Sequence, residues 1–107
     1  MSRTTYDSFL AIADTSRREI LMMLTKEKKS INTIADSFNI SRPAISKHIK
    51  VLADTGFINI ENKGRERVCS LNSKGFEEIQ NWVNYFEEFW TKELGNLEML
   101  LKKNEEG

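Results

Sequence analysis

The chain has 107 residues, of which 39% are hydrophobic and 30% are charged, and its 16 Lys and Arg balance its 16 Asp and Glu. These values fit one globular domain and exclude a disordered or membrane-embedded chain, since no apolar run approaches the roughly 18 residues of a membrane-spanning helix. Residues 1–7 lack the apolar core of a signal peptide, and Cys69 is the single cysteine, so we expect a cytoplasmic protein without a disulfide or a multi-cysteine metal cluster.

Three short helices are predicted in the first 39 residues. An apolar pattern that begins at Ser8 indicates the first of them. Thr15 or Ser16 is the expected N-cap of the second, with Glu19 three residues after Ser16 in the position of a capping box. The third is predicted over residues 30–39, capped by its serine and closed by its final asparagine.

A fourth helix, a hairpin and a long final helix are predicted after residue 40. Ser41 is a good N-cap, and Pro43 fits the first helical turn because it has no amide proton to satisfy. Two strand-like runs, residues 57–61 and 67–71, flank a polar turn that contains a glycine. The last helix is expected over residues 73–104.

This order of elements predicts one mainly α-helical domain over residues 1–107, with a small β-hairpin. Two short helices joined by a few residues around position 40 suggest a helix-turn-helix. A hairpin directly after the second of them suggests the winged form.

The fourth helix has two faces of opposite character. At about 100° per residue, its bulky apolar residues lie on one side, and Arg42, Ser46, Lys47 and Lys50 lie on the other, where no acid is expected. An ordinary solvated face is the alternative, but the short helix before it and the basic turn after it favour DNA, because these side chains suit base edges and phosphates. His48 lies on the shoulder between the two faces, where a role as a metal ligand is not expected.

The basic residues are unevenly distributed along the chain. Residues 1–72 hold 12 Lys and Arg against 8 Asp and Glu, a balance of +4, and residues 73–107 hold 4 against 8, a balance of −4. The hairpin turn adds Lys63, Arg65 and Arg67, which could follow the phosphate backbone or enter the minor groove. Residues 1–72 are therefore the part of the chain that is expected to bind DNA.

The last helix is too apolar to be covered by the domain before it. Left bare, its aromatic stripe would be a larger exposed patch than soluble monomers usually carry. A two-fold dimer through the first and last helices is the favoured solution, since the acidic polar face argues against binding to anionic lipid. The expected interface residues are Tyr6, Phe9, Leu10, Trp82, Phe86, Phe89, Trp90, Leu94, Leu97 and Leu101.

Several of these segments together resemble the ArsR-type winged-helix repressors. The similar segments are ADTSRREIL at residues 13–21, SRPAISKHIKVL at 41–52 with TGFI at 55–58, and KGRER at 63–67. The resemblance implies a homodimeric transcription factor whose DNA contacts come from Ser41, Arg42, Pro43, Ser46, Lys47, His48 and Lys50 of one helix and from Lys63, Arg65 and Arg67 of the wing.

The chain departs from that family where many members bind metal. Residues 31–36 contain no cysteine, and the last helix has neither His nor Asp. The chain is therefore similar to the members without a metal site, of which the SdpR-like autorepressors are one group. The expected protein is a dimeric repressor of its own operon that binds a pseudo-palindromic operator, has no cofactor and does not respond to metal.

Two alternatives stay open. One is a metal sensor whose ligands bridge the subunits, with His48 or Cys69 joined by carboxylates. The other is a protein-interaction module that kept the fold and lost DNA binding. An enzyme is not expected, because one histidine, one cysteine and no glycine-rich phosphate loop leave no nucleophile–base pair or cofactor motif.

Overall fold

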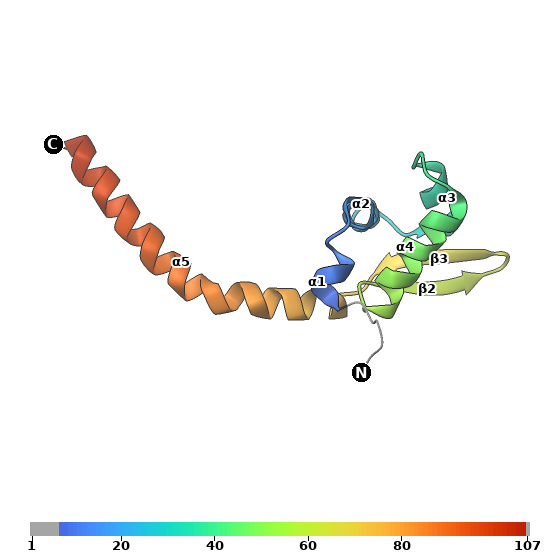
Figure 1. The fold of residues 1–107 in the computed structure, drawn as a ribbon. Coiled ribbons are helices and arrows are strands. Elements are labelled where there is room, and N and C mark those ends of the chain that lie inside the picture. Colours follow the sequence, from blue (N-terminus) through green and yellow to red (C-terminus); the bar gives the residue numbers. More distant parts are fainter. Residues whose placement is uncertain (1–6, 107) are drawn as a thin grey trace.

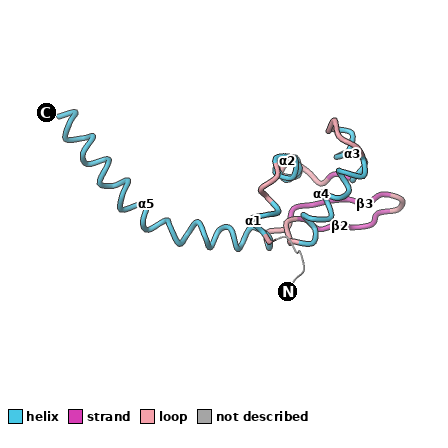
Figure 2. The backbone as a smooth tube through the Cα atoms, in the orientation of Figure 1, coloured by secondary structure: helices cyan, strands magenta, loops and turns pink. Residues whose placement is uncertain are grey.

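The computed structural model describes the backbone of residues 7–106 and the side chains of residues 7–93. Five helices and three strands follow one another as α1 (Ser8–Ala11), α2 (Thr15–Leu24), β1 (Lys29–Ser30), α3 (Ile31–Asp36), α4 (Arg42–Asp54), β2 (Ile58–Lys63), β3 (Glu66–Leu71) and α5 (Lys74–Glu106). Figures 1 and 2 show the β2–β3 hairpin beside α4, with α5 extending away from all other elements. The predicted fold class, mainly helical with a winged helix-turn-helix, is confirmed.

The sheet has one strand more than the predicted hairpin. Its strand order is β1-β3-β2, and both pairings are antiparallel. β1 joins through the pairs Lys29↔Cys69 and Ser30↔Val68. These two residues lie immediately before α3, so the sheet ties the first helix of the helix-turn-helix directly to the wing.

Each of the first four helices begins with a side chain that accepts a hydrogen bond from a backbone amide of its first turn. The capping residues are Asp7, Asp14, Ser30 and Ser41, at oxygen–nitrogen distances of 2.7, 3.1, 3.1 and 3.2 Å. The predicted cap of α2 at Thr15 or Ser16 is therefore wrong. The expected closure by Asn39 is wrong too, because α3 ends at Asp36 and, within residues 7–106, only Gly56 and Gly64 have positive φ.

The core lies between the helices and the inner face of the sheet. The predicted apolar face of α4 is confirmed, since Ile45, Ile49 and Leu52 are buried. Phe57 joins three elements: its amide donates to Leu52 O, its carbonyl accepts from the Asn72 amide, and its ring meets Phe76 edge-on with ring centroids 4.8 Å apart. The wing and the start of α5 are thereby fixed to the end of α4.

The first turns of α5 pack against α1, and the helix then continues into solvent (Figure 1). The ring of Phe9 in α1 meets the ring of Trp82 in α5 edge-on, with ring centroids 5.4 Å apart. Within the described residues, no helix is both long and apolar enough to cross a membrane.

Candidate nucleic-acid interface

The outer face of α4 presents the side chains that the sequence placed there. Ser41 and Pro43 begin the helix, and the predicted set Arg42, Ser46, Lys47 and Lys50 is exposed. The prediction that this face carries no acid is wrong at its C-terminal end. Asp54, the last residue of α4, lies one turn beyond Lys50, and its Oδ2 is 3.0 Å from Lys50 Nζ. Lys50 is therefore partly neutralised, whereas Lys47 forms no ion pair with a described carboxylate.

The wing places two exposed arginines near the start of α4. Gly64 turns the chain between β2 and β3 with φ +64°, a conformation in which side chains are disfavoured. Lys63 lies 3.9 Å from Glu61, so part of its charge is also balanced. Arg65 and Arg67 have no described carboxylate within ion-pairing distance.

A cleft of about 180 Å³ separates α3 and the first turns of α4 from the wing. It is lined by Ser30, Ile31, Asn32, Arg42, Ser46, Arg65, Glu66 and Arg67. On the side of the cleft formed by α3 and α4, Arg42 Nη2 donates a hydrogen bond to Asn32 Oδ1. The three predicted DNA-binding arginines thus share one small polar cleft, and Glu66 is the only acid among its described lining residues.

His48 does not join this surface, because its ring is directed toward α2. Its Nδ1 lies 3.1 Å from Nη1 of Arg17, and its Nε2 lies 4.0 Å from Asp14 Oδ1. Since a guanidinium can only donate, Nδ1 is the acceptor in the contact with Arg17, and Nε2 is the ring nitrogen that faces Asp14. His48 therefore connects α4, the helix with the basic outer face, to the start of α2.

Arg17 and Asp14 complete this connection, and sequence reasoning missed both. Arg17 is buried, and its guanidinium also donates to Ala11 O and Leu10 O at 2.6 and 3.3 Å. Partial burial raises the pKa of Asp14, but the hydrogen bond from the Arg17 amide and the charges of His48 and Arg17 outweigh it, so this pKa lies below its usual value. The carboxylate is ionised at neutral pH.

We expect Asp14→Ala to lower the free energy of unfolding by about 1 kcal/mol at pH 7, since it removes the N-cap of α2. Because the folded-state pKa is lowered, the carboxylate's extra stabilisation is present above the unfolded-state pKa near 3.8 and is lost as the pH falls through the folded-state value. Urea unfolding at pH 7 and pH 3 would therefore show a smaller difference between Asp14→Ala and the unmodified chain at pH 3. Asp14→Asn, which keeps a capping oxygen without the charge, is the control, and a difference that does not depend on pH would contradict this account.

The single cysteine is part of the core. Cys69 in β3 is fully buried, and burial raises the pKa of its thiol although Arg67 opposes the change. The thiol is therefore protonated at neutral pH. Among the residues with described side chains, no three His, Cys, Asp or Glu lie together where they could hold a metal ion.

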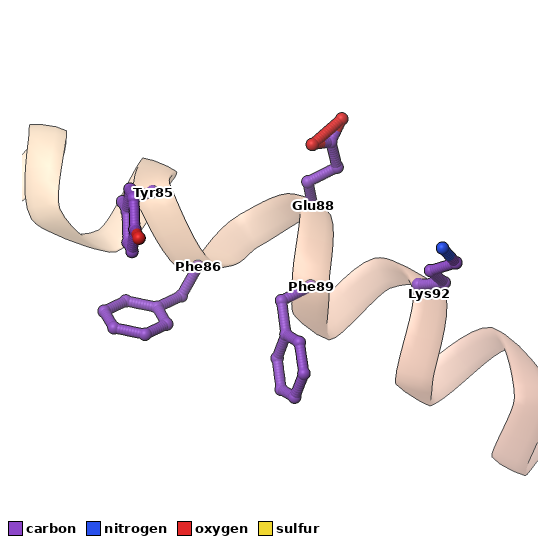
Figure 3. A pocket seen from close by; sticks show the side chains of 5 residues that line it. All are labelled: Tyr85, Phe86, Glu88, Phe89 and Lys92. Carbon is purple, nitrogen blue, oxygen red and sulfur yellow. The ribbon is translucent and has the colours of Figure 1, made fainter.

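A row of aromatic side chains stays exposed along α5. Trp82, Phe89 and Trp90 keep 55%, 53% and 52% of their surface, and Leu10 of α1 keeps 49%. Figure 3 shows the rings of Phe86 and Phe89 leaving α5 on one side and Glu88 on the other. These three residues, with Tyr85 and Lys92, line an open hollow of about 580 Å³. Of the predicted interface residues, Tyr6 and the side chains of Leu94, Leu97 and Leu101 lie outside the described residues.

Comparison with known proteins identifies the family. Residues 14–59 match the family model described as bacterial regulatory protein, arsR family. The transcriptional repressor SdpR of Bacillus subtilis (strain 168) is 37% identical over 78 residues, which cover 73% of this chain and 87% of SdpR. The chain belongs to the ArsR family. The HTH-type transcriptional regulator Rv2034 of Mycobacterium tuberculosis (strain ATCC 25618 / H37Rv) is 30% identical over 91 residues, covering 85% of this chain and 82% of that protein.

The fold of this ArsR-family protein agrees with solved structures. The crystal structure of an ArsR family transcriptional regulator superposes with a TM-score of 0.72 at 31% identity, covering 78% of this chain and 92% of that one. The chain is therefore an ArsR-family transcriptional regulator, a DNA-binding protein, as its sequence predicted.

Sequence reasoning about this ArsR-family chain missed Asn32 as well as Arg17. Asn32 is an exposed polar residue in a helix of six residues, ten positions before the arginine that it contacts. No periodicity within one helix relates residues on α3 to residues on α4. Only the crossing of the two helices brings this pair together.

Proposed function

We propose that this regulator is a homodimeric repressor of its own operon that binds a pseudo-palindromic operator and is not released by metal. The observation that carries the proposal is the joint surface of α4 and the wing, where Arg42, Lys47, Arg65 and Arg67 are exposed without a described carboxylate partner. A surface of this charge suits the phosphates and base edges of one major groove and its flank.

The dimer is supported by the exposed aromatic row of α5 and by α1. A two-fold interface uses the same patch on both subunits, so the row of one protomer would cover that of its partner. Two α4 helices related by this axis would enter major grooves about 34 Å apart, one turn of DNA, which matches a pseudo-palindromic site. The helix that joins the two DNA-binding surfaces would then carry the acidic residues Glu77, Glu78, Glu87 and Glu88.

Repression without a metal signal is supported by the chain's own residues and by the relative named as a repressor. Residues 31–36 have no cysteine, and residues 74–106 have neither His nor Asp. The metal-sensing alternative would need His48 or Cys69. His48 already binds Arg17, and Cys69 is buried in β3.

Fluorescence anisotropy with duplexes from the DNA upstream of the chain's own gene tests this proposal. We expect the logarithm of the affinity to fall linearly with the logarithm of the KCl concentration between 50 and 200 mM, with a slope of about −0.9 for each phosphate contact. Lys47→Ala should weaken operator binding by roughly ten- to a hundredfold, since one good base contact contributes about 1–3 kcal/mol, and should leave the dimer intact.

Two results would favour the alternatives. If zinc released the duplex, the protein would be a metal sensor. If no upstream fragment bound at any salt concentration, the protein-interaction module would be the better description.

A further inference from the structure

The basic side chains near α4 differ in how far their charge is already balanced. Lys50 lies 3.0 Å from Asp54 and Lys63 lies 3.9 Å from Glu61, so each has a carboxylate of its own. Arg42, Arg65 and Arg67 form no ion pair with a described residue, and yet all three line the same cleft of about 180 Å³. Of the lining residues that the structure describes, Glu66 is the only acid. Three guanidinium groups beside one carboxylate leave a local excess of positive charge that an anion would relieve.

Asn32 is the hydrogen-bond partner of Arg42. The Arg42 guanidinium donates through Nη2 to Asn32 Oδ1, a bond that crosses from α4 back to α3. Arg42 therefore lines the cleft between α3 and the wing, whereas Lys47 is exposed and is not among the described residues of its lining. A planar guanidinium held at one nitrogen still has further N–H groups, which fit two oxygens of a phosphate.

We propose that this cleft binds one phosphodiester group of the DNA backbone, that Arg42 with the wing arginines forms the phosphate site, and that Asn32 is the positioning residue for Arg42. The inference rests on the proposed function and deepens it, because it divides the basic residues by role. Arg42 holds the backbone, and Lys47 of the same helix is left to read base edges. The wing and α4 then contact the same phosphate from two sides, and this contact fixes how deeply α4 enters the major groove.

The test measures binding to two duplexes, the operator and a scrambled sequence of equal length, over a range of KCl concentrations. Arg42→Ala should weaken binding to both duplexes by the same factor, about tenfold, and leave the ratio of the two affinities unchanged. The slope of the logarithm of affinity against the logarithm of salt should become less steep by about 0.9 for each arginine, or about 1.8 for a dimer. Arg42→Lys, which keeps the charge and loses the planar fork, should keep the slope.

Lys47→Ala provides the contrast within the same helix, because it should lower the ratio of operator to scrambled affinity. If Arg42→Ala instead lowered that ratio and left the salt slope unchanged, Arg42 would read bases and the inference would be overturned. If the unmodified protein bound neither duplex, the proposed function itself would have failed. Circular dichroism melting of each variant establishes that the fold is intact.

The role of Asn32 is tested by a double-mutant cycle. Asn32→Ala should weaken binding to both duplexes by a smaller factor than Arg42→Ala, and should add nothing when Arg42 is already alanine. A merely structural role would cost the same in both backgrounds, so additive losses would overturn the positioning role.

Isothermal calorimetry with inorganic phosphate separates a DNA site from a site for a free anion. We expect no saturable heat at 5 mM phosphate, because a single diester contact depends on the rest of the duplex for its affinity. Saturable heat that Arg42→Ala abolishes would assign the cleft to a free anion and would overturn the assignment to the DNA backbone.

Discussion

Phe89→Asp is expected to convert the proposed dimer to a monomer. Phe89 lies in the exposed row of α5 with its ring 5.0 Å from that of Trp90, and 53% of its surface is free in the single chain. An aspartate there would bring an unpaired charge into an apolar interface, and a two-fold axis would do so twice. At about 2 kcal/mol or more for each copy, the dimer dissociation constant would rise roughly a thousandfold or more.

The same change should weaken operator binding by roughly 10²- to 10⁴-fold, because a monomer loses the effective concentration that links the two half-sites. Sedimentation equilibrium gives the dissociation constant, and anisotropy gives the affinity for DNA. Thr91→Asp is the matched control, since it adds the same charge two residues away, about 200° around the helix and on the opposite face. A dimer that survives Phe89→Asp, or one that Thr91→Asp disrupts equally, would contradict the proposed interface.

Gly75→Ala is expected to lower the free energy of unfolding by about 2–3 kcal/mol, as overpacking does in a filled core. Gly75 is buried in the first turn of α5, where an added Cβ would lie 2.6 Å from Cγ and 2.8 Å from the backbone nitrogen of Phe57. Neither atom can move freely, because Phe57 is fully buried and its backbone is hydrogen-bonded to Leu52 and Asn72. For a domain of this size the melting temperature would fall by about 8–20 °C.

The packing of Gly75 and simple helix propensity predict stability changes of opposite sign for this substitution. Alanine in place of glycine within a helix normally stabilises by about 0.5–1 kcal/mol, so propensity alone predicts a higher melting temperature. Gly64→Ala in the wing is the control: open space surrounds its position, and its φ of +64° makes a cost of about 1 kcal/mol the expected value. Thermal unfolding followed by circular dichroism measures all three proteins, and a Gly75→Ala protein as stable as the unmodified chain would contradict the packing argument.

Features encoded within one segment were predictable from the sequence. The apolar and basic faces of α4 follow from spacing alone, and Ser41 with Pro43 marks its beginning. The hairpin follows from two strand-like runs around Gly64. In each case the residues that interact, or share a face, lie within about a dozen positions of one another.

Features that depend on contact between distant segments were not predictable. β1 has two residues and no strand pattern of its own, and it forms because β3, 38–40 positions later, offers unpaired backbone groups. Arg17 has the appearance of a surface arginine and is buried because His48 and two carbonyl groups satisfy its donors. The cap of α2 was misplaced by one or two residues because Asp14, Thr15 and Ser16 are all capping residue types, and only backbone geometry separates them.

The β1–β3 pairing also sets a minimum length for folding. The family match spans residues 14–59, yet β3 begins at Glu66 and the glycine that closes against Phe57 is residue 75. A nascent chain that has released only the matched stretch holds the helices of the helix-turn-helix without the strand that pairs with β1. We therefore expect these helices to reach their final packing late in synthesis, together with the wing and the start of α5. The stretch that matches the family model is therefore shorter than the stretch whose contacts complete the fold.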